Sequence, residues 1–373
     1  MPLRPGAPTL YFVYICWVEI SPEHINLFFE RSKAANCAGV IYSLPFQTEF
    51  EILIQDLNHP TKDPLDPFIF FPFDETKVEG FQLNPTHQIE KAIEFLKSFP
   101  NGKGHWTNPG LIYVDSTSRE QYEGSFKNYQ KEIQTGICTK AILSTIVKKE
   151  IPKDFNVGEY ILKLRNEYPQ AFIYLFSSPI TGTWLGATPE TLLKWETGIV
   201  STMSLAGTRK NSHGDFQFGE KEKKEQEIVT DYIRQIFEKR FSNVKTDPTT
   251  KLSYGDMEHL ITRVEASTES YFSKKDLLDL AAELHPTPAV GGYPKIEAID
   301  LIKKTETHPR LFYSGFLGPI HQGSAHLAVN LRCMCIAEMY VFIFAGGGIT
   351  SDSIVDAEWE ETRLKAQALL KFL

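Results

Sequence analysis

Apolar residues recur along the chain with two different spacings, and these spacings predict most of its elements. Apolar residues three and four positions apart predict helices at residues 88–99, 126–134, 155–168, 220–241, 274–284, 296–304 and 355–373. Short apolar or alternating runs predict strands at residues 11–18, 140–147, 171–177, 192–195 and 199–205, and two further hairpins between residues 311 and 346. The stretch from Pro60 to Pro85 lacks a clear period and is expected to be irregular or short-stranded.

Short turns, such as Glu196-Thr197-Gly198, join several of these strands, and short turns favour antiparallel pairing. The predicted fold class is therefore α+β, with large, mostly antiparallel sheets packed as a sandwich-like core and helices outside. The Gly- and Asn-rich stretch 101–110 is a candidate subdomain boundary. The length of 373 residues fits one large domain or two ordinary ones. We expect a single domain over residues 1–373, in which residues 1–120 are the less certain N-terminal part.

The composition limits the classes of function. With 42% hydrophobic residues the chain can bury a large core, and a net charge of −8 argues against nucleic acid as a partner. An anionic small substrate is still possible, because its binding depends on local basic groups and not on the net charge. The five scattered cysteines fit a reduced, cytoplasmic protein. No apolar stretch approaches the ~20 residues that span a bilayer, and the start lacks the small-residue cleavage site of a signal peptide, so we expect no membrane partner.

The last predicted helix carries acidic residues on the face that should be buried. One stripe at steps of three and four holds small or apolar residues and a single acid: Ala357, Glu361, Leu364, Ala368 and Phe372. Glu358 and Lys365 lie within a turn on the same side, so two carboxylates and an ammonium group converge. A solvated helix face with an i,i+4 ion pair is the structural alternative.

The long charged helix repeats this pattern. Val229, Tyr232 and Ile236 form its apolar face, and Glu225 extends that face by one turn. A fraying, solvated first turn is the structural alternative. Two helices that each carry a carboxylate in line with a buried stripe suggest a shared cation. Carboxylate ligands without His or Cys point to a hard ion, Mg²⁺.

Two further residues carry candidate acid–base chemistry. Lys140 lies in the apolar strand CTKAILSTIV, where it is either at the open end of the strand or desolvated. Desolvation is what makes a lysine a usable base. Glu190 follows Thr188-Pro189, which also reads as the cap and first turn of a helix. Spacing alone does not make Glu190 catalytic.

Two segments are rich in glycine. FAGGGIT (residues 344–350) follows a predicted strand but lacks the GxGxxG spacing and a helix directly after it, which argues against a dinucleotide-binding fold. Its run of backbone amides is able to hold a carboxylate instead. In HPTPAVGGYPK (residues 285–295), His285 is expected to be a packed or capping histidine and not a ligand.

Seven segments, taken in order, resemble one family: LAGTR (205–209), KEKKEQEIV (221–229), LHPTPAVGGYPK (284–295), FYSGFLGPI (312–320), NLRC (330–333), FAGGGI (344–349) and EWEETRLKAQALL (358–370). This pattern is similar to the chorismate-utilising enzymes, which include isochorismate synthase, salicylate synthase and the large subunits of anthranilate and aminodeoxychorismate synthase. The resemblance extends from Lys140 to the C-terminus and implies the α+β fold of that family. The first 120 residues match it weakly.

The resemblance implies a substrate and a metal. Glu225 and Glu361 would ligate Mg²⁺, with Glu358 close by, and the ion would hold the ring carboxylate of chorismate. Lys365 would bind the same end of the substrate, together with backbone groups of Ala206, Gly207, Thr208 and Gly346.

The resemblance also implies how the rest of the substrate is bound and which nucleophile is used. Arg332 and Tyr313 would bind the enolpyruvyl carboxylate, since an arginine fork suits a carboxylate by geometry and charge. The amine-transferring members have glutamine where Lys140 stands and threonine where Ala289 stands. Lys140 therefore suggests that the family member activates water as the nucleophile, and Ala289 suggests the members that form isochorismate. Salicylate synthases share the lysine but usually carry the threonine, which ranks isochorismate synthase first and salicylate synthase second.

The implied reaction is addition of water at C2 of chorismate with loss of the C4 hydroxyl, with Lys140 as general base and Glu190 as general acid. An inactive chorismate-binding relative is the non-enzyme alternative, which would be expected to lose at least one functional residue. We expect a monomer or homodimer that serves menaquinone biosynthesis, with a siderophore-pathway isochorismate synthase as the alternative. Two departures from the family pattern are Gln226, where a histidine is usual, and the segment after Arg209. Because Gln226 is outside the expected ligands, we expect the metal site to survive.

Overall fold

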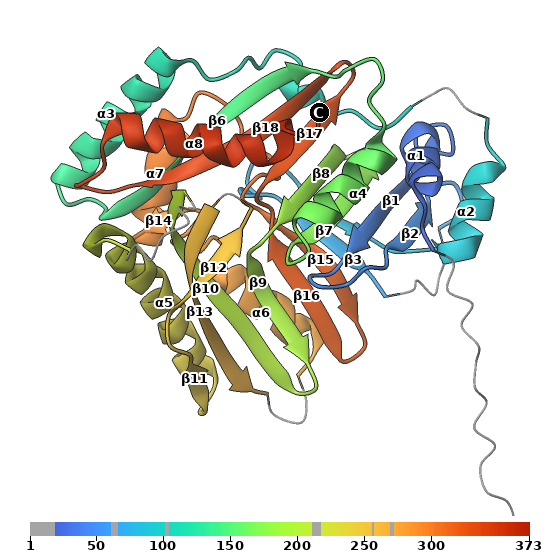
Figure 1. Cartoon of the computed structure of the whole chain (residues 1–373). Helices are drawn as coiled ribbons and strands as arrows, with labels where there is room; N and C mark the ends of the chain where they lie inside the picture. The colour runs from blue at the N-terminus through green and yellow to red at the C-terminus, as the bar shows by residue number, and fades with distance from the viewer. Residues whose placement is uncertain (1–18, 61–65, 101–103, 211–217, 256, 269–271) are drawn as a thin grey trace, which may run out of the picture.

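The computed structural model describes residues 19–60, 66–100, 104–210, 218–255, 257–268 and 272–373. Within these ranges two nine-stranded sheets pack against each other, and their strand pairs run antiparallel. Figure 1 shows the helices on the outer sides of the two sheets. The expected fold class, α+β with mostly antiparallel sheets and helices outside, is confirmed.

The first sheet has the strand order β14-β6-β18-β17-β8-β7-β1-β2-β5. In that order the strands are Gly292–Tyr293, Lys140–Glu150, Tyr340–Ile349, Cys333–Ala337, Gly182–Thr188, Phe172–Ser178, Cys37–Ser43, Glu51–Asp56 and His87–Gln88. Its outer face packs against α1 (Pro22–Arg31), α2 (Ile89–Lys97), α4 (Val157–Glu167) and α8 (Val355–Leu370). Beside β6 lie α3 (Arg119–Gln134) and α7 (Lys295–Thr305). A short 3-10 helix, Pro109–Leu111, precedes α3.

The second sheet has the order β11-β13-β10-β9-β16-β15-β3-β4, and β12 also pairs with β13. In that order the strands are Val244–Thr246, Met257–Ser267, Ile199–Lys210, Thr191–Glu196, Ser324–Val329, Phe316–His321, Phe68–Phe71 and Phe81–Leu83, with β12 at Thr250–Tyr254. Its outer face packs against α5 (Glu220–Arg240) and α6 (Lys274–Leu284).

Aromatic rings fill the space between the two sheets. The ring of Phe70 lies 4.5 Å from that of Phe312 and 5.1 Å from that of Phe176, and Trp184 meets it edge-on at 6.2 Å. Such tilted and edge-on pairs add to the energy of apolar burial. Phe344 belongs to the same core, so the aromatic packing that joins the sheets also supports a wall of the cavity described below.

Two neighbouring connections carry the chain from one sheet to the other. Residues 189–190 join β8 to β9, and residues 330–332 join β16 to β17. The connections are hydrogen bonded: the amide of Val329 donates to the carbonyl of Glu190 at 2.9 Å, and the Thr188 hydroxyl donates to the carbonyl of Val329 at 2.5 Å. The helix start read from Thr188-Pro189 is therefore wrong, because the hydroxyl that would cap it is used between the sheets.

The expected helices and most expected strands are confirmed, with shifts of several residues at their ends. The stretch 60–85 is short-stranded as expected, since it contains β3 and β4. The expected strand at residues 11–18 lies outside the described residues. The elements that were not expected from the sequence are α1, β1, β2, β5, β8, β11 to β13 and β14.

Candidate active site

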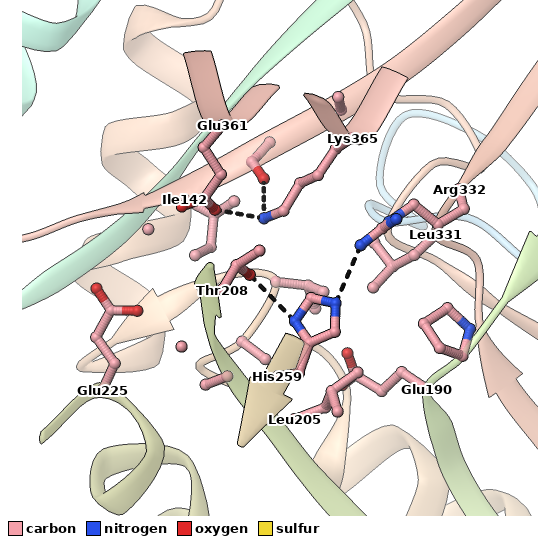
Figure 2. Close-up of a pocket in the computed structure, with 18 of the residues that line it drawn as sticks. Ile142, Glu190, Leu205, Thr208, Glu225, His259, Leu331, Arg332, Glu361 and Lys365 are labelled. Atoms are coloured by element: carbon pink, nitrogen blue, oxygen red, sulfur yellow. Dashed lines mark hydrogen bonds and ion pairs between the residues drawn. The ribbon is translucent and has the colours of Figure 1, made fainter. Parts of the chain in front are cut away.

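A cavity opens where the two sheets approach α5 and α8. It encloses about 690 Å³ of space, part of which is open to solvent. Figure 2 shows Glu225 on one side of it and Arg332 on the other. All the residues expected to act on the substrate or metal line it, except Glu358: Lys140, Glu190, Ala206, Gly207, Thr208, Glu225, Ala289, Tyr313, Arg332, Gly346, Glu361 and Lys365.

Lys140 is the first residue of β6 and projects into this cavity. It is only 2% exposed, and its Nζ lies 3.8 Å from Oε2 of Glu225. Its side chain has room because residue 348 is glycine: a Cβ there would lie 2.7 Å from Cε of Lys140. Of the two readings of Lys140 from the sequence, the desolvated one is confirmed.

Glu190 is a buried carboxyl group on the crossover between β8 and β9. It is 2% exposed. Burial raises its pKa to about 8, although the positive charges of Lys140 and Lys365 act in the opposite direction. A carboxyl group with this pKa keeps its proton near neutral pH and is able to donate it.

Arg332 presents a guanidinium group with spare hydrogen-bonding capacity. Its NH2 lies 3.2 Å from Nε2 of His259, and its buried NH1 has no hydrogen-bond partner among the described residues. Burial and the nearby Arg332 hold the pKa of His259 well below its usual range, so His259 is neutral and Nε2 can accept a hydrogen bond. Nδ1 of His259 then donates to Oγ1 of Thr208 at 3.2 Å. A buried unpaired guanidinium nitrogen in a cavity is suited to an anion.

Gly207 interrupts the pairing of β10 with β13. Ala206 pairs with Leu260 and Thr208 pairs with His259, so Gly207 is an extra residue at a β-bulge, with φ of 64°. The backbone at Gly207 is thereby released from the ladder beside the cavity. This geometry agrees with the expected substrate-binding role of residues 206–208, which stays a prediction.

Lys365, Gly346 and Tyr313 lie close together on another wall. Nζ of Lys365 donates to the carbonyl of Gly346 at 2.7 Å and lies 2.6 Å from Oε1 of Glu361. A Cβ at position 346 would lie 2.9 Å from the hydroxyl of Tyr313, so only glycine lets this tyrosine approach. Residues 344–349 were expected to follow a strand. They instead belong to β18 and pair with β6.

Ala289 lies on a wall formed by the segment that follows α6. The amides of Val290 and Gly291 both donate to the carbonyl of Thr287, at 3.0 and 2.9 Å, which closes a tight turn around Ala289. His285 ends α6, and its Nε2 donates to the carbonyl of Ser314 at 2.7 Å. His285 is therefore a packed, capping residue, as the sequence predicted.

The buried face of α8 differs from the stripe read from the sequence. Ala357 is exposed, whereas Glu358, Thr362 and Ala366 are buried. Compared with the expected stripe, the helix is rotated about its axis so that Glu358 and Thr362 face inward, because it packs against the glycines of β18. A Cβ at Gly347 would lie 3.2 Å from Oε2 of Glu358 and 3.6 Å from Oε1 of Glu361.

The stripe on α5 is also shifted in part. Val229 and Ile236 are buried as expected, Tyr232 is half-buried, and Ile233 takes its place. Glu225 keeps a side chain that is 12% exposed and faces the cavity. The solvated alternative is therefore wrong for Glu225, although Glu220 and Lys223 in the first turn are exposed.

Ammonium groups hold the carboxylates that were expected to bind metal. Nζ of Lys221 lies 2.5 Å from Oε1 of Glu358 and 3.9 Å from Oε1 of Glu225, and Lys365 pairs with Glu361. Burial and the neighbouring Glu361 raise the pKa of Glu358, while Lys221 lowers it. Three carboxylates from two helices are a donor set that suits Mg²⁺. However, in the ranges that the structure describes, no three His, Cys, Asp or Glu side chains are gathered into a metal cluster.

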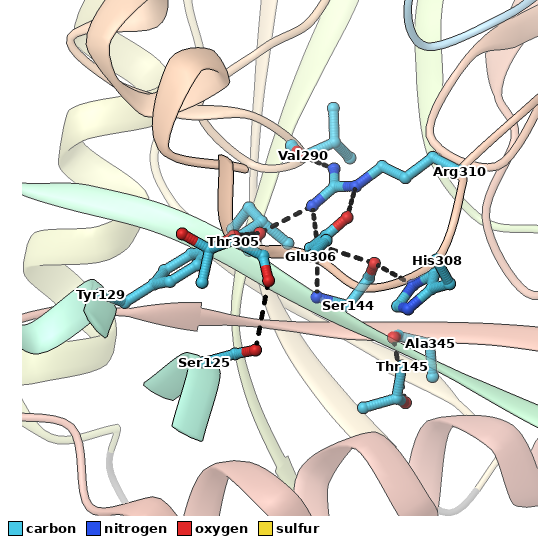
Figure 3. Close-up of polar contacts among 11 residues, drawn as sticks. Ser125, Tyr129, Ser144, Thr145, Val290, Thr305, Glu306, His308, Arg310 and Ala345 are labelled. Atoms are coloured by element: carbon cyan, nitrogen blue, oxygen red, sulfur yellow. Dashed lines mark hydrogen bonds and ion pairs between the residues drawn. The ribbon is translucent and has the colours of Figure 1, made fainter. Parts of the chain in front are cut away.

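A buried ion pair behind the cavity ties its walls together (Figure 3). Glu306 and Arg310 are joined by two hydrogen bonds of 2.8 and 2.7 Å, and both side chains are 4% exposed. Arg310 also donates to the carbonyls of Val290 and Ile142, and Ser144 donates to Glu306 through its amide and hydroxyl. Val290 and Ile142 both line the cavity, so this network fixes β6 relative to the turn around Ala289.

A family model described as chorismate binding enzyme matches residues 81–373. The chain belongs to this family. The assignment confirms the resemblance read from the seven sequence segments. It also extends toward the N-terminus beyond Lys140, where the sequence motifs began.

The relatives of this chorismate-binding enzyme include anthranilate synthase components and isochorismate synthases. Anthranilate synthase component 1 from Aquifex aeolicus is 27% identical over 68% of this chain, and isochorismate synthase EntC from Escherichia coli K12 is 30% identical over 62% of it. The chain spans 53% and 61% of the length of these two relatives. The structure of the menaquinone-specific isochorismate synthase MenF from Escherichia coli superposes with a TM-score of 0.75 at 20% identity, covering 93% of this chain and 91% of that one. That likeness shows a shared fold.

Sequence reasoning missed His259 and assigned no structural role to Gln226. His259 lies on β13, whose alternating sequence MEHLITRVEA carried a strand signal that was not used. Gln226 is 2% exposed, and its Nε2 donates to the carbonyl and hydroxyl of Ser204 and to the hydroxyl of Thr262. It therefore fixes the start of α5 to the second sheet. The departure after Arg209, KNSHG (residues 210–214), lies outside the described residues except for Lys210, the last residue of β10. Over the described ranges, every helix is too short or too polar to cross a bilayer.

Proposed function

We propose that this protein is an isochorismate synthase, which converts chorismate to isochorismate. The observation that carries the proposal is the placement of Lys140 and Glu190, both 2% exposed, on the walls of one cavity. The same cavity holds NH1 of Arg332, which has no hydrogen-bond partner in the part of the chain that the structure describes. A buried amine and a protonated carboxyl group are the two partners that exchange of one hydroxyl group for another requires.

The amine of Lys140 takes a proton from water as the water oxygen bonds to C2 of the ring. The ring double bonds shift, the bond from C4 to its hydroxyl oxygen breaks, and Glu190 gives its proton to the departing oxygen, which leaves as water. The product is an isomer of the substrate; Lys140 has gained one proton and Glu190 has lost one, so the return of one proton from Lys140 to Glu190 restores the pair.

Substrate binding follows from the charges around the cavity. The fork of Arg332, held by neutral His259, would take the enolpyruvyl carboxylate, with the hydroxyl of Tyr313 nearby. Lys365 and the released backbone around Gly207 would lie at the ring carboxylate. These assignments rest on the cavity lining and on the sequence motifs of the family.

Mg²⁺ is the proposed cofactor, with Glu225 and Glu361 as ligands and Glu358 close by. When bound, the ion would neutralise the ring carboxylate and favour electron flow toward it in the transition state. The donor chemistry supports this choice, since hard oxygen ligands without His or Cys favour Mg²⁺. The proposed use of the product in menaquinone biosynthesis, the cytoplasmic location and the monomeric or dimeric state stay predictions.

Product identification tests the proposal. Purified protein incubated with chorismate and Mg²⁺ should form isochorismate, separated by chromatography, and EDTA should abolish its formation. Formation of salicylate and pyruvate would assign the protein to the second candidate, salicylate synthase, which shares Lys140 but usually has threonine in place of Ala289. Chorismate binding without turnover would indicate an inactive relative.

A further inference from the structure

Lys221 places an ammonium group among the carboxylates that are proposed to bind Mg²⁺. It lies on α5 one turn before Glu225, and its Nζ reaches across to Glu358 on α8 at 2.5 Å while staying 3.9 Å from Oε1 of Glu225. Lys221 is thus in contact with proposed ligands from both helices. The ammonium group of Lys221 is therefore already a cation that α5 and α8 share.

The contact between Lys221 and Glu358 is more than a surface ion pair. The side chain of Glu358 is 3% exposed, whereas that of Lys221 is 30% exposed. A buried carboxylate needs a counter-charge, because the protein interior solvates it poorly. Lys221 provides that charge for Glu358, as Lys365 does for Glu361 at 2.6 Å.

We propose that Lys221 competes with Mg²⁺ for the carboxylates of this site and so weakens metal binding in the absence of substrate. This inference rests on the proposed function, because it assumes that Glu225 and Glu358 face the ion. An ion placed between these two residues would displace the Lys221 ammonium group, since two cations at such short range repel each other.

The side chains around the site differ in their ability to move aside. Lys140 is 2% exposed and confined beside Gly348, whereas Lys221 has about a third of its surface in contact with solvent. Its long, flexible stem can turn outward without opening the core. Lys221 is therefore the ammonium group that gives way, and its Glu358 contact is what metal binding must break.

The test compares Mg²⁺ binding to the full-length wild type and to the Lys221→Met variant by isothermal titration calorimetry, after EDTA treatment and without chorismate. Methionine keeps the length of the stem and removes the charge. Lys223→Met is the matched control: it removes the same charge from the same helix, where Lys223 is 54% exposed and pairs with Glu220. Lys221→Arg keeps a cation within reach of Glu358.

The Lys221→Met variant should bind Mg²⁺ about tenfold more tightly than the wild type, while Lys223→Met and Lys221→Arg stay within about threefold of it. Without Mg²⁺ the Lys221→Met variant should also melt at a lower temperature, because Glu358 has lost its partner, and saturating Mg²⁺ should raise its melting temperature more than that of the wild type. This second measurement would also reveal a variant that fails to fold, in which case Lys221→Gln replaces it.

Three results would overturn the inference in distinguishable ways. Unchanged or weaker Mg²⁺ binding by Lys221→Met, with normal binding by the wild type, would show that Lys221 is no competitor and leave the proposed function intact. An equal gain in Mg²⁺ affinity in Lys223→Met would show that the effect comes from the net charge and not from the position of Lys221. Absence of Mg²⁺ binding to every variant, even with chorismate added, would remove the proposed metal site itself.

Discussion

Nζ of Lys140 lies 3.8 Å from Oε2 of Glu225, although Lys140 belongs to β6 of the first sheet and Glu225 to α5 outside the second. The proposed base and a proposed metal ligand are therefore neighbours in space. A substrate whose ring carboxylate was held by the Mg²⁺ proposed to bind at Glu225 would present the adjacent ring carbon to the Lys140 side of the cavity. This relationship makes the position of Lys140 the most sensitive feature of the site.

Gly348→Ala should slow the reaction by displacing Lys140. The new Cβ would lie 2.7 Å from Cε of Lys140, which is closer than real contacts allow. A displacement of the base by about 1 Å should lower kcat by about 10- to 100-fold, with little change in KM because Arg332 is untouched. Steady-state kinetics measures both values. The control is Gly124→Ala in α3, where a Cβ would meet no described residue within 4 Å. An unchanged kcat in Gly348→Ala would contradict the role of Lys140.

Glu190 predicts a loss of activity at alkaline pH. Its pKa is raised to about 8 by burial, and the protonated form is the one that gives a proton to the leaving group. The kcat of the wild type should therefore fall as pH rises through about 8. Glu190→Gln, which has no proton to give, should be slower by about 10²- to 10⁴-fold at every pH. A wild-type kcat that stays constant or rises across this range would argue against Glu190 as the acid.

The same group links stability to pH. The pKa of Glu190 is about 8 in the folded protein and 4.5 for an ordinary glutamate, so between these values the folded state binds the extra proton. The free energy of unfolding should then decrease as pH rises from 4.5 to about 8. Glu190→Gln removes this contribution, and its melting temperature relative to the wild type should increase over that range. Thermal unfolding at several pH values tests this, and parallel pH profiles of the two proteins would refute it.

Arg332→Lys should weaken substrate binding more than it slows the chemistry. A lysine has no planar fork to share between His259 and a carboxylate, and NH1 of Arg332, which has no partner within the described ranges, is lost. We expect KM for chorismate to rise by about 10- to 100-fold, with a smaller change in kcat. Arg263→Lys, on a side chain that is 54% exposed, is the control. If KM were the same in both variants, the anion would have to bind elsewhere.

The buried pair of Glu306 and Arg310 should contribute far more to the free energy of unfolding than a surface pair does. Arg310→Met leaves the charge of Glu306 buried without its partner, which should lower the free energy of unfolding by about 3–5 kcal/mol. The double variant Glu306→Gln/Arg310→Met should recover part of this loss. Arg240→Met breaks the pair with Glu283, whose side chains are 33% and 36% exposed, and should cost about 0–1 kcal/mol. Urea denaturation measures all three, and equal losses in the two single variants would contradict this account.

The residues of the site were predicted from the sequence more accurately than the local structure around them. Lys140, Glu225 and Arg332 were expected to act together, and the structure brings them to one cavity. This succeeded because ordered motifs identify residues whatever path the chain takes between them. The buried face of α8 was misplaced by one position, since an apolar stripe does not reveal that the helix packs against the glycines of β18 and buries Glu358.

Long-range pairing explains the other misses. Thr188-Pro189 has the local chemistry of a helix start, but its hydroxyl bonds to Val329, which is far away in sequence. The role of His259 depends in the same way on Thr208 and Arg332, which come from two other parts of the chain. Local propensity cannot report such partners, because tertiary contacts override it.

The central claim is that Lys140 activates water for addition to the ring, and oxygen-18-labelled water tests it most directly. Wild-type protein incubated with chorismate and Mg²⁺ in labelled water should give isochorismate that carries one oxygen-18 atom, as measured by mass spectrometry. Lys140→Met should give neither product nor label, while Lys148→Met, at the outer end of the same strand, should behave like the wild type. Isochorismate formed without the label, or labelled at the normal rate by Lys140→Met, would contradict the account.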